Sequence, residues 1–210
     1  MTRILIADDH EVVRSGLRSI LETQSGWDVV AEAADGKEAI AKAVETKPDV
    51  AVVDYSLPLI NGIEVTRQIR RRLPSTEILI FTMHDSEALI DELLRAGARG
   101  LLLKTDAARH LLEAIETLAA HKSFFTSEVS ETLLRSFLRR PSRSKSNLTP
   151  RERQIVQLIA EGNSNKQIAS ILGVSFKTVE THRAAVMRKL NLSSAAALVR
   201  YAVRNKLVEP

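Results

Sequence analysis

The sequence of 210 residues contains no cysteine, which excludes disulfide bonds, thiolate metal sites and a cysteine nucleophile. No apolar run approaches the roughly 20 residues of a membrane-spanning helix. The N-terminus also lacks the basic region and long apolar region of a secretory signal. We therefore expect a cytoplasmic protein that has no membrane partner.

Charge is distributed unevenly along the chain. Residues 1–130 carry 15 Lys and Arg against 21 Asp and Glu, whereas residues 131–210 carry 15 against 5. The formal charge of +4 therefore combines an acidic part with a strongly basic one. This split favours an acidic regulatory or catalytic domain followed by a domain that binds a polyanion, most often nucleic acid.

Short apolar runs alternate with helix-like segments over the first 120 residues. The runs typical of buried strands are residues 3–7, 28–33, 49–54, 77–82 and 100–103. Apolar residues at three- and four-residue spacing indicate helices over residues 12–23, 36–46, 62–73, 86–96 and 107–121. The alternation predicts a doubly wound, flavodoxin-like α/β domain, with five parallel strands and helices on both faces of the sheet.

The remainder of the chain predicts helices only. A helix over residues 127–138 precedes RRPSRSKSN, residues 139–147, which is basic, rich in serine and free of apolar residues. Further helices are expected over residues 150–161, 165–172, 175–190 and 194–205. Thr149 and Glu152 fit a capping box with Pro150 in the first turn, and Gly162 fits the end of that helix. We expect an α/β domain over 1–122, a linker over 123–146 and a small all-α domain over 147–210.

Polar side chains follow four strands of the predicted sheet. Asp8 and Asp9 come after the first strand, Asp54 ends the third, Thr82 ends the fourth and Lys104 follows the fifth. The carboxyl ends of parallel strands meet at one edge of a sheet, where ligands bind. Three close carboxylates repel unless a cation or a raised pKa intervenes, and an all-oxygen donor set suits Mg²⁺. A Mg²⁺ ion beside a carboxylate nucleophile, with Lys104 and the Thr82 hydroxyl to stabilise developing charge, is the set of groups that phosphoryl transfer onto an aspartate needs.

Each of these residues also has a purely structural interpretation. Asp9 alone is typical of a cap for the helix that follows. Lys104 alone is typical of a solvated surface lysine, and Thr82 of a strand-end threonine. Only the joint arrangement favours a functional site.

The segments ILIADDH, VVDYSLPLINGIEV, ILIFTMHD and GARGLLLKTD together resemble the receiver domain of two-component response regulators, over about residues 1–120. The resemblance implies that Asp54 accepts a phosphoryl group from a sensor histidine kinase. It also implies that Asp8, Asp9, Asp54 and the backbone carbonyl of Ser56 hold Mg²⁺. Lys104 would contact the phosphoryl oxygens, and Thr82 would move toward them.

The chain departs from the receiver pattern at two positions, and at two others its residues do not predict the lifetime of the phosphoryl group. Leu101 stands where many receivers carry a Tyr or Phe that rotates together with the threonine, and Thr105 stands where many carry a proline. Ser56 and His84 occupy positions that in receivers influence the lifetime of the phosphoryl group, and His84 is expected at the rim of the site. An aromatic switch cannot operate at Leu101, which keeps open the alternative that the receiver serves only as a dimerisation module.

Two of the C-terminal helices form a helix-turn-helix pattern. The segments KQIASIL and FKTVETHRAAVMRKL are joined by the short turn GVS, which contains a glycine. The stretch resembles the LuxR-type DNA-binding domain over about residues 147–208, and its combination with a receiver is that of the NarL/FixJ subfamily. The resemblance places Glu180, Thr181 and Ala184 against base edges of double-stranded DNA. The residues expected near the DNA backbone are Lys177, Thr178, His182, Arg183 and Lys189, and Arg188 is also expected to bind DNA.

The alternative for Glu180 is an ion pair with Arg183 on the helix surface, and for the basic residues a solvated charged face. The last helix carries apolar residues on more than one side, which suits core packing, a homodimer contact, or both.

We therefore expect a phosphorylation-activated transcription regulator that binds DNA as a dimer. We do not expect an enzyme, beyond slow self-catalysed phosphoryl transfer and dephosphorylation. Two alternatives stay open: a Mg²⁺-dependent phosphatase or phosphotransferase, and a DNA-binding protein whose receiver serves only for dimerisation.

Overall fold

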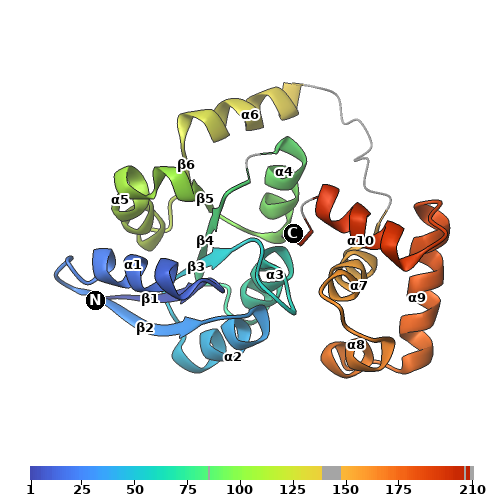
Figure 1. Cartoon of the computed structure of the whole chain (residues 1–210). Helices are drawn as coiled ribbons and strands as arrows, with labels where there is room; N and C mark the ends of the chain where they lie inside the picture. Colours follow the sequence, from blue (N-terminus) through green and yellow to red (C-terminus); the bar gives the residue numbers. More distant parts are fainter. Residues whose placement is uncertain (85, 139–147, 206, 209–210) are drawn as a thin grey trace. The chain divides into compact units, whose positions relative to one another are not determined.

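The computed structural model describes residues 1–84, 86–138, 148–205 and 207–208. The chain divides into two compact units, Met1–Ser142 and Arg143–Pro210. The border between them falls within residues 139–147, the predicted linker, which lies outside the described residues (Figure 1).

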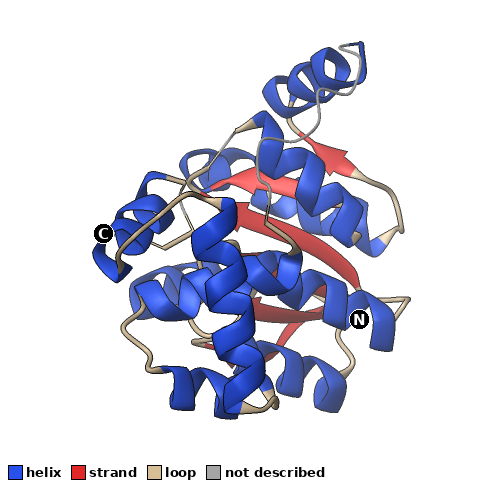
Figure 2. Cartoon of the chain, turned by 90° about the vertical axis from the view of Figure 1, so that its right-hand side faces the viewer, coloured by secondary structure: helices blue, strands red, loops and turns tan. Residues whose placement is uncertain are grey.

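The first unit is built on one parallel sheet with the strand order β2-β1-β3-β4-β5-β6. The strands are β1 (Thr2–Ala7), β2 (Trp27–Ala33), β3 (Val50–Asp54), β4 (Glu77–Thr82), β5 (Gly100–Leu103) and β6 (Phe124–Phe125). The helices are α1 (Glu11–Leu21), α2 (Gly36–Thr46), α3 (Gly62–Arg72), α4 (Glu87–Ala96), α5 (Ala107–Ala119) and α6 (Ser127–Leu138), with the short 3₁₀ turn η1 (Lys104–Asp106) before α5. The predicted doubly wound α/β class is confirmed, and the strands (red in Figure 2) lie among the covering helices.

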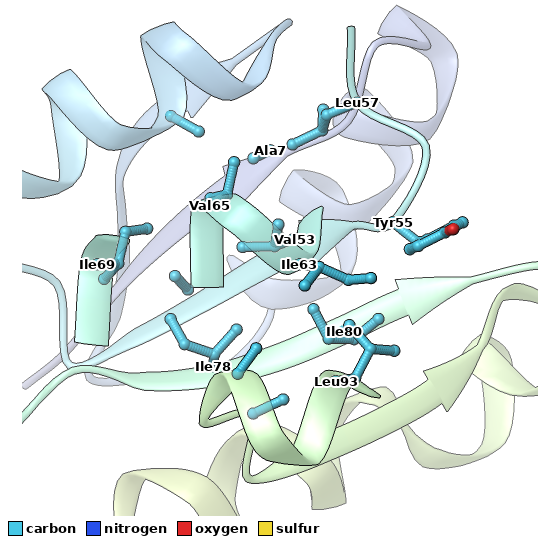
Figure 3. Close-up of a cluster of buried hydrophobic side chains, with 14 of the residues drawn as sticks. Ala7, Val53, Tyr55, Leu57, Ile63, Val65, Ile69, Ile78, Ile80 and Leu93 are labelled. Carbon is cyan, nitrogen blue, oxygen red and sulfur yellow. The ribbon is translucent and has the colours of Figure 1, made fainter. Parts of the chain in front are cut away.

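Two apolar layers form on the two faces of the sheet, because alternate residues of a strand point to opposite sides. Leu5, Val53 and Ile80 belong to one core cluster, together with residues of α2, α3, α4 and α6. Figure 3 shows Val53 and Ile80 of this cluster beside Ile63 of α3 and Leu93 of α4. Ile4 and Val52 belong to the other cluster, together with residues of α1 and α5. The central strands are buried on both faces, which explains their continuous apolar sequences.

Strand β6 was not predicted from the sequence, which indicated five strands. It has two residues, and it pairs with β5 through Gly100 opposite Phe124 and Leu101 opposite Phe125. A two-residue strand is too short to show an alternating pattern. Its pairing covers part of the edge that β5 would otherwise present.

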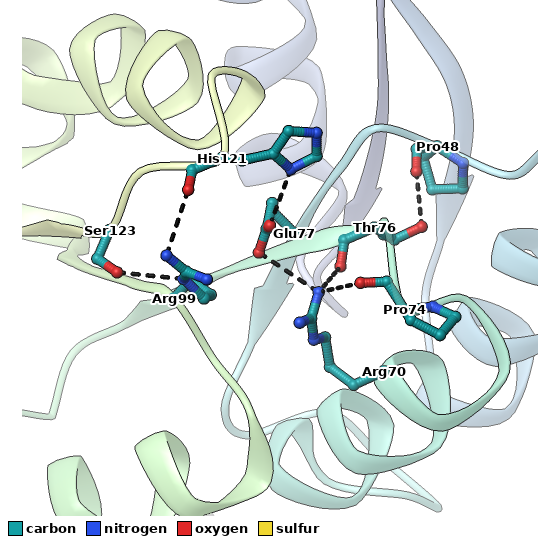
Figure 4. Close-up of polar contacts among 8 residues, drawn as sticks. All are labelled: Pro48, Arg70, Pro74, Thr76, Glu77, Arg99, His121 and Ser123. Atoms are coloured by element: carbon teal, nitrogen blue, oxygen red, sulfur yellow. Dashed lines mark hydrogen bonds and ion pairs between the residues drawn. The ribbon is translucent and has the colours of Figure 1, made fainter.

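Glu77, the first residue of β4, is a buried acidic residue at the amino-terminal end of the sheet and is 4% exposed (Figure 4). The carboxylate of Glu77 lies 3.4 Å from Nη1 of Arg70 and 3.0 Å from Nδ1 of His121. The same Arg70 nitrogen donates to the backbone carbonyls of Pro74 and Thr76, at 2.7 and 2.8 Å. These contacts compensate for the buried carboxylate and tie α3 and the end of α5 to the start of β4.

Gly62 brings the start of α3 against the end of β3. A Cβ atom at this position would lie 2.4 Å from the carbonyl oxygen of Asp54 and 2.8 Å from Cα of Tyr55. The Gly62 amide donates to the Tyr55 carbonyl at 2.9 Å. Glycine is therefore required by close approach of the backbone. The contact sets the position of the strand end that carries Asp54.

The second unit contains helices only, within its described residues: α7 (Pro150–Ala160), α8 (Asn165–Leu172), α9 (Phe176–Lys189) and α10 (Ala195–Arg204). The capping box is confirmed: Thr149 accepts from the Glu152 amide, and Glu152 accepts from the Thr149 amide. Gly162 follows α7 with a φ of +87°, as the sequence predicted for the helix end.

Candidate functional site

Four acidic or basic residues from three strand ends meet at the carboxyl edge of the sheet. Asp8 follows β1 and is 1% exposed, and Asp54 ends β3 and is 3% exposed. Lys104 follows β5, and its Nζ lies 2.7 Å from Oδ2 of Asp8 and 3.0 Å from Oδ2 of Asp54. Asp9 lies beside Asp8 with a third of its side chain exposed. The strand-end rule therefore brought distant residues together correctly.

Asp9 does not cap α1. The residue in the cap position is His10, which makes no capping hydrogen bond through its side chain. Oδ1 of Asp9 instead lies 2.9 Å from Nδ1 of His10. The structural interpretation of Asp9 as a helix cap is therefore wrong, and its carboxylate is available at the site.

His10 belongs to this cluster although the sequence reasoning passed over it. Its backbone amide donates to Oδ1 of Asp8 at 2.9 Å. Asp8, Asp9, His10 and Asp54 each offer a possible ligand atom, and these atoms all lie within 4.8 Å of one another. The signal was present in the sequence, since His10 directly follows the two aspartates in ADDH.

The electrostatics of the site follow from burial and from the neighbouring charges. Burial raises the pKa of Asp54 to about 6, against the opposing effect of Lys104, and the Asp8 charge adds to the increase. Burial would lower the pKa of Lys104, but the carboxylates of Asp54 and Asp8 outweigh it and raise this pKa. The Asp9 carboxylate raises the pKa of His10. Asp54 is thus ionised above about pH 6, although its buried charge is poorly solvated.

The donor set fits a hard divalent cation. Asp8 and Asp54 are both buried and share the single ammonium of Lys104, and Asp9 adds a third carboxylate beside them, so negative charge remains at the site. Carboxylate oxygens are the ligands that ions such as Mg²⁺ and Ca²⁺ prefer. The acidic cluster can therefore hold a metal ion.

Thr82 and its neighbours form the rim of the site. Thr82 is fully buried at the end of β4, and its hydroxyl accepts the backbone N–H of His84 at 3.1 Å. The His84 ring meets the Tyr55 ring edge to face at 5.7 Å. Leu101, where many receivers have an aromatic residue, is 1% exposed and lies opposite Phe125 in the pairing of β5 with β6. At this edge of the site the rings of His84 and Tyr55 pack together, and the Thr82 hydroxyl accepts one hydrogen bond from the backbone.

The helix-turn-helix is formed by α8, the turn at Gly173 and α9. Gly173 ends α8 with a φ of +62°, a conformation that glycine adopts without strain. Val179 and Val186 of α9 are fully buried, so they mark its core face. Exposed residues on α9 include Lys177, Thr181, Ala184, Arg188 and Lys189, whereas Thr178, Glu180, His182 and Arg183 are half-buried.

Several of the predicted DNA contacts have partners within the protein, among them Glu180, Arg183 and Lys189. Glu180 lies 3.7 Å from Lys177, and Arg183 donates to the side-chain carbonyl of Asn165 at 3.1 Å. The alternative pairing of Glu180 with Arg183 is therefore not what the structure contains. Lys189 lies 2.7 Å from Oε2 of Glu152, so it stabilises the fold in addition to its predicted role at the DNA backbone.

We expect Glu152→Gln to destabilise α7 by about 1–2 kcal/mol at neutral pH. Gln keeps the capping hydrogen bond but loses the ion pair with Lys189. Burial opposes ionisation of Glu152, yet its bonds to Lys189 and Thr149 lower its pKa below the ordinary 4.5. A lowered folded-state pKa gives stability that is present above about pH 4.5 and is lost as the pH falls through the folded-state value.

Hydrogen exchange of the α7 amides measures this effect, with the β3 amides as the internal control. The protection lost in Glu152→Gln should shrink as the pH is lowered below about 4.5. An α7 that exchanges equally in both proteins at pH 7 would show that the ion pair adds nothing.

Comparison with known proteins identifies both units. The family described as response regulator receiver domain matches residues 4–116. The family described as bacterial regulatory proteins, luxR family, matches residues 146–202. The chain belongs to the LuxR-type two-component response regulators.

The relatives of this response regulator include the oxygen regulatory protein NreC of Staphylococcus aureus, which is 42% identical over 99% of both chains. A LuxR-family response regulator from Aurantimonas sp. SI85-9A1 is 38% identical, with a TM-score of 0.63 over 66% of this chain and 99% of that one. RcsB from Salmonella enterica serovar Typhimurium, bound to the rprA promoter, is 27% identical, with a TM-score of 0.65 over 95% of this chain and 97% of that one.

This response regulator is a phosphorylation-regulated, DNA-binding transcription regulator, as expected from the sequence. Its family consists of regulators rather than enzymes. In the described part of the chain, no helix is both long and apolar enough to cross a bilayer.

Proposed function

We propose that Asp54 accepts a phosphoryl group from a sensor histidine kinase and that the phosphorylated protein binds DNA as a homodimer in the cytoplasm. In this proposal residues 1–122 are the receiver, residues 123–146 the linker and residues 147–210 the DNA-binding domain. The observation that supports it most strongly is the pair of buried carboxylates, Asp8 and Asp54, that share the Lys104 ammonium.

The reaction at Asp54 is an in-line displacement. A carboxylate oxygen of Asp54 forms a bond to phosphorus while the bond from phosphorus to the donor nitrogen breaks, and that nitrogen keeps the electron pair. Lys104 contacts the phosphoryl oxygens, which it can do because its ammonium already lies 3.0 Å from Asp54. Mg²⁺ held by Asp8, Asp9, Asp54 and the Ser56 carbonyl would neutralise the added negative charge.

Thr82 couples the reaction to the shape of the receiver. The phosphoryl group adds between about 1.5 and 2 negative charges and three strong acceptor oxygens. The Thr82 hydroxyl, which now accepts from the His84 amide, can turn to donate to those oxygens. That movement changes the packing at the start of the β4–α4 connection.

DNA is bound through α9 in the major groove. Glu180, Thr181 and Ala184 lie against base edges, where the Glu180 carboxylate accepts from a cytosine amino group. The phosphates are contacted by Lys177, Thr178, His182, Arg183, Arg188 and Lys189. The Lys177 ammonium lies 3.7 Å from the Glu180 carboxylate, and the Lys177 side chain is 86% exposed. An ion pair this long and exposed contributes little free energy, so Lys177 can exchange Glu180 for a DNA phosphate.

Selection of DNA from a random pool, with and without acetyl phosphate and Mg²⁺, tests the proposal. We expect the phosphorylated protein to bind its selected duplex about 5–150-fold more tightly than the unphosphorylated protein, the usual range of coupling between two sites. Equal affinity in both states would instead favour a receiver that serves only for dimerisation, the alternative that Leu101 keeps open.

A further inference from the structure

Phe176 is an aromatic residue at the start of α9, and 49% of it is exposed. Among residues 148–205 and 207–208, every other large apolar side chain is buried or half-buried. A single exposed apolar residue is common on protein surfaces. The exposure of Phe176 alone therefore does not indicate a binding site, and a functional role has to be argued from the position of the ring on α9.

Phe176 occupies the part of the helix-turn-helix that reads base edges, since the first residues of the second helix enter the major groove in this motif. Residues four apart are neighbours on a helix surface, so Phe176 begins the row that continues with Glu180 and Ala184. The helix start is also fixed: the Ser175 hydroxyl accepts the Thr178 amide at 3.1 Å. The ring is thus presented from an ordered helix end beside two residues placed against base edges.

A phenyl ring has no hydrogen-bond donor or acceptor, so it cannot read phosphates or the polar edges of bases. The apolar group that the major groove offers is the 5-methyl group of thymine. Contact between the ring and this methyl group removes apolar surface of both from water. The charged neighbours of Phe176, such as Lys177, would meanwhile hold the helix on the phosphates.

We propose that Phe176 specifies a thymine in each half-site, through contact of its ring with the thymine 5-methyl group. The inference rests on the proposed DNA-binding function, and it adds an apolar determinant to the polar contacts placed along α9. It predicts that the preferred site loses affinity when one particular thymine in each half-site loses only its methyl group.

A thymine-to-deoxyuridine scan of the selected duplex tests the proposal, because each replacement removes one methyl group and no hydrogen-bonding atom. The full-length protein, treated with acetyl phosphate and Mg²⁺, is titrated with each duplex by fluorescence anisotropy. For the wild type we expect about a fourfold loss of affinity at one position per half-site. In Phe176→Ala that difference should vanish, so that the thymine and deoxyuridine duplexes bind equally.

Two further variants make the result specific. Phe176→Gln replaces the ring by a long side chain that favours helix formation, and it should also lose the thymine preference. It provides a second test in case the alanine variant does not fold. Lys177→Ala, the matched control on the neighbouring residue, should weaken binding to all duplexes and keep the preference.

Three results would overturn the proposal. They are a wild-type protein indifferent to every methyl group, a preference that persists in both Phe176 variants, and a preference that Lys177→Ala also removes. A wild type that selects no sequence at all would contradict the proposed function and this inference with it. A folded Phe176→Ala protein that still selects DNA without the preference supports the inference.

Discussion

Asp54→Asn is expected to abolish phosphorylation of the protein by acetyl phosphate. An amide cannot form the acyl phosphate, and Asp54 is the carboxylate that ends β3, 3% exposed and 3.0 Å from the Lys104 ammonium. DNA affinity of the variant should stay at the unphosphorylated level whether or not acetyl phosphate is present. Gel separation of the phosphoprotein and anisotropy titration with the selected duplex measure the two effects.

The matched control is Asp35→Asn, which changes the same groups at a helix cap. Asp35 accepts the Glu38 amide at the start of α2, and Asn caps helices equally well, so phosphorylation should be unchanged. If Asp54→Asn bound and regulated DNA as well as the phosphorylated wild type, the receiver would act without its phosphoryl group.

Replacing Asp8 and Asp9 together by Asn is expected to slow phosphorylation roughly 100-fold or more. The variant loses both carboxylates on the β1 side of the proposed metal site, and Lys104 loses the partner that lies 2.7 Å away. Calorimetric titration with Mg²⁺ should show weak binding or none, and the phosphorylation rate should lose its dependence on the Mg²⁺ concentration.

The control for this double variant is Glu11→Gln, an exposed acidic residue in the first turn of α1. It should change neither Mg²⁺ binding nor the rate. Phosphorylation of the double variant at the wild-type rate with Mg²⁺ would contradict the role assigned to the acidic pair.

The sequence predicted the sheet and the acidic site because both depend on simple periodic rules. The buried strands read as continuous apolar runs, and four of the five predicted runs end in, or lead directly into, a polar residue at the same edge of the sheet. Asp8, Asp54 and Lys104 are up to 96 positions apart in the chain, and parallel topology alone was enough to bring them together.

Other features depend on neighbours that no local pattern specifies. The need for glycine at position 62 comes from the Asp54 carbonyl, which only the folded chain places there. The pairing of Lys189 with Glu152 joins residues 37 positions apart on separate helices, and Glu180 pairs with Lys177 rather than Arg183 because Arg183 is held by Asn165. Side-chain partners of this kind follow from tertiary packing, so sequence periodicity cannot supply them.

The most direct test of the account is to locate the phosphoryl group. The wild-type protein is incubated with acetyl phosphate and Mg²⁺, the acyl phosphate is reduced with borohydride, and the resulting homoserine is located by tandem mass spectrometry. We expect homoserine at position 54 alone. The fraction of the protein that carries it should rise in proportion to the increase in DNA affinity. Homoserine at another aspartate, or a gain in affinity without any modification of Asp54, would contradict the account.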